Sequence, residues 1–187
     1  MKILSIPNEN GKMTCFWEEG ASSGKKPLII CLADKEEDAQ RDLNLLFSQA
    51  NGASVAALVI YPQTEEQIVG DWLYSLRQRE DVDENRITLT GTLSAADWVW
   101  RLGSHFPQWF AGICAVGGYG DPYEVRAMKN VPVRAYLVEE EPQIIRKEKV
   151  AVNVDQLVMS LLTAGSECVE MRSMYEKNPW NKAIQED

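Results

Sequence analysis

Histidine is almost absent from this chain, because its 187 residues include only one, His105. The four cysteines, Cys15, Cys31, Cys114 and Cys168, are far apart, and no two of them have CxxC spacing. Zinc sites need clusters of cysteine and histidine at short spacing, so we expect no metal site. Cys31 and Cys114 lie inside apolar runs, which is typical of small buried side chains in a reducing compartment.

Clustered positive charge and long apolar runs are also lacking. The net charge is −9, from 28 acidic and 19 basic residues, whereas proteins that bind nucleic acid rely on clustered lysine and arginine. No apolar run approaches the ~20 residues that cross a bilayer. The first residues, MKILSIPNENGK, lack the long apolar core of a signal peptide. We therefore expect a cytoplasmic protein with neither a nucleic-acid nor a membrane partner.

What is present is an ordinary globular composition, with 45% apolar and 25% charged residues, which predicts one domain over residues 1–187. Two apolar patches, 3–6 and 13–17, flank turn residues and predict an antiparallel hairpin. Continuous apolar runs typical of strands buried in a parallel sheet occupy residues 27–32, 54–61 and 131–138. Amphipathic helices are predicted at 66–78 and 154–164.

Strands that alternate with helices predict a fold of the α/β class. We expect a compact three-layer α/β/α sandwich without a lid domain, in which a mostly parallel sheet carries helices on both faces. Crossovers between its parallel strands should be right-handed. No glycine-rich phosphate loop follows the first parallel strand, so the pattern disfavours a nucleotide cofactor and we expect no cofactor.

The most informative stretch is RITLTGTLSAADWVWR, which begins at Arg86. Ile87–Leu89 predicts a short buried strand, and Thr90–Thr92 is a break of small residues after a predicted turn at 81–85. Apolar residues at helical spacing follow the break: Trp98, Leu102 and Phe106. A strand, a tight turn and a helix form the arrangement that presents the nucleophilic serine of α/β hydrolases.

Short motifs around this stretch follow one another along the chain: Val82-Asp83, Arg86-Ile87-Thr88-Leu89-Thr90-Gly91, Trp100-Arg101-Leu102, His105-Phe106-Pro107, Phe110-Ala111-Gly112, Ile113-Cys114, Gly117-Gly118 and Asn178-Pro179-Trp180-Asn181. Together they resemble the α/β-hydrolase family of small esterases, in its phospholipase/carboxylesterase-like or polyester-depolymerase-like branch. The resemblance covers roughly residues 27 to 180. It implies the α/β-hydrolase fold and carboxylic-ester hydrolysis by a serine, a histidine and an acid.

The position of the nucleophile has two readings. Without gaps, Gly91 and Ala95 match the two glycines of the family's G-x-S-x-G motif, and Leu93 matches the serine. Leucine has no nucleophilic atom. If one residue is inserted, Ser94 becomes the nucleophile instead. A structural role for Ser94 is also open, because Asp97 three residues later would complete a capping box at a helix N-terminus.

The other catalytic positions depart from the resemblance as well. The family's general base falls on Lys177, and His105 matches a position at the end of the helix, about 15 Å from the turn. The acid position matches Glu141. A Ser94–Lys177 dyad would need a buried lysine with a lowered pKa. The loop that should hold an oxyanion, residues 32–36, carries acidic side chains that would repel it.

An incomplete catalytic triad predicts a pseudoenzyme of the hydrolase fold that acts by binding. We expect a small molecule or a protein segment to occupy the former active-site cleft, with Trp98, Tyr119 and Trp180 at its rim. The alternative is an active carboxylesterase-type hydrolase that uses Ser94 as a shifted nucleophile. The sequence leaves the oligomeric state open.

Overall fold

The computed structural model describes residues 2–8, 11–21, 23–61, 63–138 and 151–174. They divide into two compact units, residues 1–88 and 89–187. The N-terminal unit contains β1 (Lys2–Asn8), β2 (Gly11–Glu18), β3 (Lys26–Ala33), α1 (Glu36–Gln49), β4 (Ser54–Val59), α2 (Glu66–Arg77) and the first part of β5 (Val82–Thr92). The C-terminal unit contains the end of β5, α3 (Ser94–His105), η1 (Pro107–Trp109), β6 (Gly112–Val116), η2 (Glu124–Met128), β7 (Val133–Val138), α4 (Val154–Thr163) and β8 (Val169–Met174).

The described strands form one mixed sheet with the order β1-β2-β4-β3-β5-β6-β7-β8. β1 and β2 are the predicted antiparallel hairpin, with Lys2 opposite Trp17, and β2 is also antiparallel to β4. The pairs β3–β4, β6–β7 and β7–β8 are parallel. This sheet with its helices confirms the predicted fold class.

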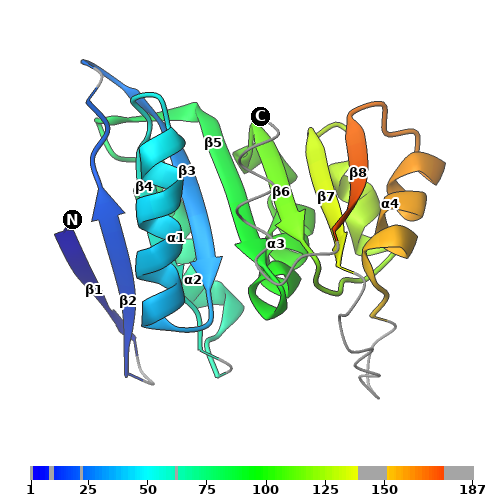
Figure 1. Ribbon diagram of the computed structural model, residues 1–187, viewed down its shortest axis with the longest axis horizontal. Helices are drawn as coiled ribbons and strands as arrows, with labels where there is room; N and C mark the ends of the chain where they lie inside the picture. Colours follow the sequence, from blue (N-terminus) through cyan, green and yellow to red (C-terminus); the bar gives the residue numbers. More distant parts are fainter. Residues whose placement is uncertain (1, 9–10, 22, 62, 139–150, 175–187) are drawn as a thin grey trace. The chain divides into compact units, whose positions relative to one another are not determined.

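The N-terminal unit carries helices on both faces of its strands. The chain moves from β3 to β4 on one side of β3, and then from β4 to β5 on the other side. Right-handed crossovers that reverse direction place their helices on opposite faces. Accordingly, Figure 1 shows α1 in front of β3 and β4 and α2 behind them. Both helices bury apolar side chains, among them Leu43 of α1 and Trp72 and Leu73 of α2.

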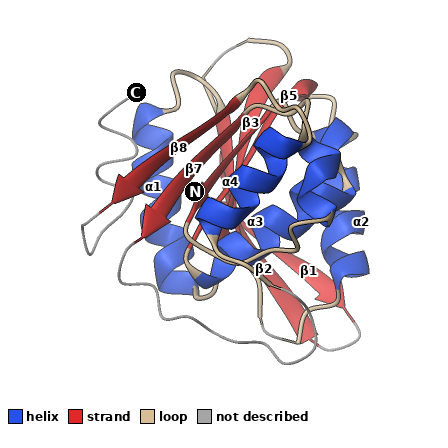
Figure 2. Cartoon of the chain, turned by 90° about the vertical axis from the view of Figure 1, so that its right-hand side faces the viewer, coloured by secondary structure: helices blue, strands red, loops and turns tan. Residues whose placement is uncertain are grey.

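In the C-terminal unit the strand order follows the chain order from β5 to β8, so the crossovers never reverse. They therefore place α3, η2 and α4 on one face. Contacts of η2 with both α3 and α4 agree with this arrangement, and Figure 2 shows α3 and α4 on the same side of β7 and β8. Trp100, Met128 and Leu157 are buried under this layer.

The strand that leads into the central turn is longer than predicted. β5 has eleven residues, so the predicted turn at 81–85 and the break at 90–92 lie largely within it. Gly91 is needed there for close packing and not as a break, because a Cβ at Gly91 would lie 2.9 Å from Cγ2 of Val99 and 3.2 Å from the carbonyl oxygen of Ala95. The glycine lets helix α3 lie directly on the end of the strand.

The apolar residues of α3 are buried to different extents. Val99, Trp100 and Leu102 are fully buried, whereas Trp98 is only half-buried. The Arg101 guanidinium lies 5.0 Å from the centre of the Trp98 ring. Trp98 therefore lies at the surface of the helix, beside a neighbouring cation. No helix among the described residues is long and apolar enough to cross a membrane.

Candidate functional site

Leu93 occupies the turn between β5 and α3 in a strained conformation. Its φ is +52° and its ψ is −123°, values that cost a residue other than glycine about 1–3 kcal/mol. Its N–H donates to the carbonyl oxygen of Val116 at 2.7 Å, and its own carbonyl accepts the N–H of Ala96 at 2.9 Å. The turn is thus held by β6 on one side and by α3 on the other. The Leu93 side chain is 44% exposed.

Ser94 is exposed and is the first residue of helix α3. The cap position before it is Leu93, which makes no side-chain capping hydrogen bond. The predicted role of Ser94 as the N-cap is therefore wrong, because the strained turn ends at Leu93 and the helix begins immediately after it. Asp97 has a different partner, since its Oδ1 accepts the backbone N–H of Tyr119 at 2.7 Å.

A glycine loop after β6 packs against the start of α3. Gly117 and Gly118 have φ values of +74° and +84°, which glycine tolerates far better than other residues. A Cβ at Gly118 would lie 2.7 Å from the Cβ of Ala96 and 2.9 Å from the Asp97 nitrogen. The indole Nε1 of Trp100 donates to the Gly117 carbonyl at 3.2 Å. These contacts fix the loop against the same helix turn that follows Leu93.

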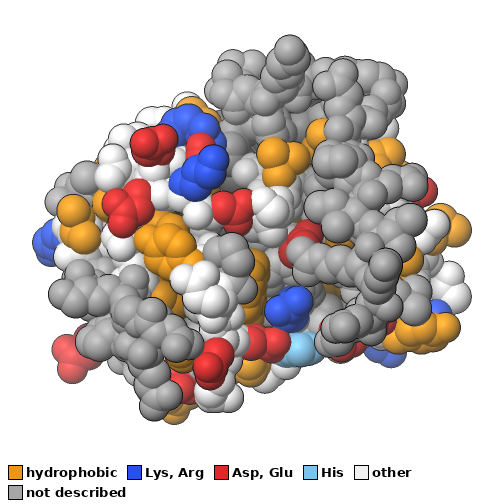
Figure 3. Space-filling view, turned by 90° about the horizontal axis from the view of Figure 1, so that it is seen from below, with side chains coloured by type: hydrophobic (Ala, Val, Ile, Leu, Met, Phe, Trp, Pro, Cys, Tyr) orange, Lys and Arg blue, Asp and Glu red, His pale blue; other side chains and the backbone are white. Residues whose placement is uncertain are grey.

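His105 lies at the other end of that helix. It is the last residue of α3, so the rise of a helix puts it about 16 Å from Ser94. Its Nε2 is 3.4 Å from Oε2 of Glu124, and both side chains are partly exposed. Figure 3 shows the histidine, in pale blue, at the surface beside acidic side chains. As predicted, His105 sits at a helix C-terminus, where a cation would meet the helix dipole.

The remaining predicted site residues lie outside the described part of the chain. They are Glu141, the acid position, Lys177, the base position, and Trp180, a predicted rim residue. Of the rim, Trp98 and Tyr119 are described and half-buried. The structure thus brings Leu93, Ser94 and the Tyr119 loop together at one end of α3.

Sequence reasoning missed two residues that organise this site. The Asp97 carboxylate and the Trp100 indole both hold the loop of residues 117–120, and neither contact could be read from local spacing. The available signal was the double glycine, because a Gly-Gly pair after a strand often marks a position where another backbone approaches closely.

The turn between β3 and α1 carries the acidic residues that the resemblance aligned with an oxyanion loop. Lys35 precedes the helix with ordinary extended angles, φ −138° and ψ +151°, and Glu36, Glu37 and Asp38 fill the first helical turn. Carboxylates in that position stabilise a helix by interacting with its dipole. Oε1 of Glu36 also accepts the Thr14 hydroxyl at 3.0 Å. These groups are built to favour the helix and would oppose a developing negative charge.

Cys15, which is buried, and Cys114, which is partly buried, are poor candidates for chemistry. Burial raises the pKa of the Cys114 thiol to about 11 and that of Cys15 to about 12. Both thiols are therefore protonated near neutral pH, whereas nucleophiles and metal ligands are thiolates. Among the described residues, no group of three or more His, Cys, Asp or Glu side chains could hold a metal ion.

No protein-family model and no curated protein matches this sequence. Solved structures do match. A thermostable esterase is 19% identical over 97% of this chain and 56% of its own, with a TM-score of 0.74. The chain has the α/β-hydrolase fold. A 2,6-dihydroxy-pseudo-oxynicotine hydrolase is 12% identical over 98% of this chain and 66% of its own, with a TM-score of 0.69.

A phospholipase/carboxylesterase from Dyadobacter fermentans matches more evenly, over 91% of this chain and 92% of its own, at 15% identity and a TM-score of 0.61. This α/β-hydrolase-fold chain therefore spans less than two thirds of the length of the first two structures and most of the third. At such identities the likeness concerns the arrangement of the backbone, not the catalytic side chains.

Proposed function

We propose that this α/β-hydrolase-fold chain is a pseudoenzyme, which lacks serine-hydrolase catalysis and acts by binding a small molecule or a protein segment at the end of α3. The observation that carries the proposal is the conformation of Leu93. In α/β hydrolases the nucleophile occupies a strained turn between strand and helix. Here the residue with strained angles at such a turn is a leucine, whose side chain carries no nucleophilic atom.

The lack of a suitable base supports the same conclusion. The only imidazole of the chain, His105, is at the far end of α3 and faces Glu124. The family's base position is assigned to Lys177 and its acid position to Glu141 by resemblance alone. In a serine protease, loss of the serine or the histidine alone lowers turnover by about a millionfold. A chain that lacks both would have no measurable triad chemistry.

The binding half of the proposal rests on what remains at the turn. The Leu93 side chain is partly exposed, and the half-buried Trp98 and Tyr119 come from the helix and loop beside it. Apolar and aromatic side chains of this kind are typical of ligand sites. An apolar acyl or aromatic group is therefore the ligand chemistry that this surface favours.

The test uses a fluorophosphonate probe and short-chain p-nitrophenyl esters on the purified chain. We expect no labelling and no turnover of the natural protein. The variant that carries both Leu93→Ser and Lys177→His should react with the probe more than either single variant, because together they would restore a nucleophile and a base. Saturable binding of a p-nitrophenyl ester without its hydrolysis supports the binding function. Absence of such binding would contradict that function.

The alternative function is an active carboxylesterase-type hydrolase in which Ser94 is the nucleophile. The observation in its favour is that Ser94 is exposed and directly follows the strained turn. Probe labelling of the natural protein that disappears in Ser94→Ala, but persists in the control Ser48→Ala on helix α1, would replace the pseudoenzyme proposal with this one.

A further inference from the structure

The edge strand β8 has an outer edge to which no described strand is paired. It is the last strand of the sheet order, and its six residues pair in parallel with β7 alone. An open strand edge presents a row of backbone donors and acceptors that can pair with another strand. The side chains on this strand decide which partner fits.

The hydrogen bonds to β7 determine which backbone groups face outward. The N–H of Val133 donates to the carbonyl of Cys168 at 2.9 Å, and Val133 is in register with Val169. In a parallel ladder, alternate residues of a strand bond to the same neighbour. Glu170 and Arg172 therefore direct their N–H and C=O groups towards β7, while Val169, Met171 and Ser173 direct theirs outward.

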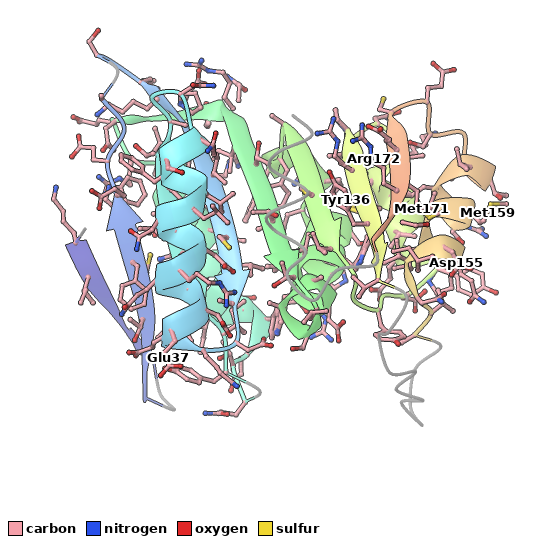
Figure 4. The ribbon with its side chains drawn as sticks, in the orientation of Figure 1. Glu37, Tyr136, Asp155, Met159, Met171 and Arg172 are labelled. Carbon is pink, nitrogen blue, oxygen red and sulfur yellow. The ribbon has the colours of Figure 1, made fainter. Side chains whose placement is uncertain are left out.

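On one face of this strand, the charges of successive side chains alternate in sign. Glu170 and Arg172 share a face because they are two residues apart. The Arg172 Nη2 lies 2.7 Å from Oε1 of Glu170. The Nε of Arg134, on β7, lies 3.4 Å from Oε2 of Glu170. Between them, Met171 is on the other face and is 42% exposed. Figure 4 labels Met171 and Arg172 on β8 and Met159 on α4.

We propose that the outer edge of β8 pairs antiparallel with β8 of a second copy of this chain, about a two-fold axis at Met171. All three outward residues then find partners, since Met171 pairs with itself and Val169 with Ser173. Glu170 of each chain lies opposite Arg172 of the other. This pairing is self-complementary, as a two-fold interface requires. Leu162 and Met159 are further exposed apolar residues, on the α4 helix that packs on β8.

Neighbouring registers are less favourable. If the two-fold axis passes through Glu170, this residue faces its own copy, and if it passes through Arg172, two guanidinium groups face each other. Like charges directly opposite on neighbouring strands are destabilising. The axis at Met171 puts opposite charges in the closer, non-hydrogen-bonded positions. The charge pattern therefore selects a second copy of the chain in one register.

The experiment measures mass by analytical ultracentrifugation over a series of concentrations of the full chain. We expect a species of twice the 21.1 kDa chain mass. Glu170→Arg and Arg172→Glu should each weaken self-association by about tenfold, because two attractive pairs become repulsive. A mixture of the two variants should restore the dimer, because each chain then faces the opposite charge. Glu167→Arg, an exposed acid that precedes β8, is the control and should not change association.

Cross-linking provides a second readout. In the Cys168→Ser background, Met171→Cys should form an intermolecular disulfide, because Cα atoms of a directly opposed hydrogen-bonded pair are about 5.5 Å apart, within the range for a disulfide. Restoration of the dimer on mixing shows that the single variants are folded. A monomeric natural chain at every concentration, or a mixture of the two charge variants that stays monomeric, overturns the proposal.

Discussion

Two turns, β3–α1 and β5–α3, each connect a strand to the helix that follows it, but they differ in backbone conformation and in what stabilises them. At the first, Lys35 has ordinary extended angles, and three acidic residues follow it in the helix. At the second, Leu93 has a φ of +52°, and small residues follow it. The first turn is stabilised by local electrostatics, whereas the second is kept strained by contacts with segments distant in the sequence.

The comparison teaches that backbone contacts, and not the side chain at position 93, hold the strained turn. The Leu93 backbone is held by the Val116 carbonyl and by the first turn of α3, and neither contact involves its side chain. A mutation at position 93 can therefore exchange the side chain while the turn keeps its shape.

The strained turn should depend on the glycine loop that packs on α3. Gly118→Ala should lower the free energy of unfolding by about 3 kcal/mol, because its Cβ would overlap Ala96 and the backbone is left-handed. Gly165→Ala is the matched control, with a φ of +89° and open space around it, and should cost about 1 kcal/mol. Urea denaturation measures both. Equal losses would show that the loop does not press on the helix.

Acidic residues in the two first helical turns should differ in their contribution. Asp97→Ala should lower the free energy of unfolding by about 2 kcal/mol, since it removes a charged acceptor from the Tyr119 N–H. Glu37→Ala should cost about 0.5 kcal/mol, because this exposed side chain (Figure 4) acts only through the dipole of α1. Thermal and urea unfolding would contradict the comparison if Glu37 proved the more important residue.

Glycine substitutions at the two turns should have opposite signs. Leu93→Gly should raise the free energy of unfolding by about 1 kcal/mol, because glycine adopts positive φ without the Cβ penalty and little buried surface is lost. Lys35→Gly should lower it by about 0.5 kcal/mol, since its angles suit any residue and glycine adds only entropy to the unfolded chain. Destabilisation by Leu93→Gly would mean that the leucine side chain itself supports the turn.

The smallest effect is the pH dependence of stability that comes from Asp81. This residue directly precedes β5, the strand that leads into the strained turn. A hydrogen bond from Arg79 lowers the pKa of Asp81 below its usual value, against a smaller opposing effect of burial. The ionised Asp81 therefore contributes its full stabilisation above the unfolded pKa of about 3.9. This contribution is lost as pH falls through the lower pKa of Asp81 in the folded protein.

Because both side chains of this pair are partly exposed and solvent screens their charges, Asp81→Asn should cost less than about 0.5 kcal/mol at neutral pH. The variant should also show a smaller loss of stability than the natural chain when both are acidified from pH 5 to pH 2. Parallel acid-denaturation curves for the two proteins would contradict this prediction.

Much of the architecture could be predicted from the sequence, because it follows from local patterns. The apolar runs that became β3, β4 and β7 and the amphipathic stretches that became α2 and α4 were found within a few residues of their bounds. Prediction was poorer for β5, where Gly91 has the composition of a break and the role of a close contact. The helical spacing of Trp98 and Leu102 also did not tell which of them is buried, because Trp98 pairs with Arg101 outside the core.

The sequence by itself determined which reactive groups the chain possesses. Its one imidazole is at position 105, and the residue between Thr92 and Ser94 is a leucine, which has no reactive atom. Only the tertiary structure decided that Leu93 is the strained residue and that Ser94 already belongs to the helix. The physical reason is that the Leu93 N–H bonds to the Val116 carbonyl and that Gly118 packs on the first turn of α3, at Ala96 and Asp97. Both partners come from β6 and its following loop, and no local pattern around position 93 records them.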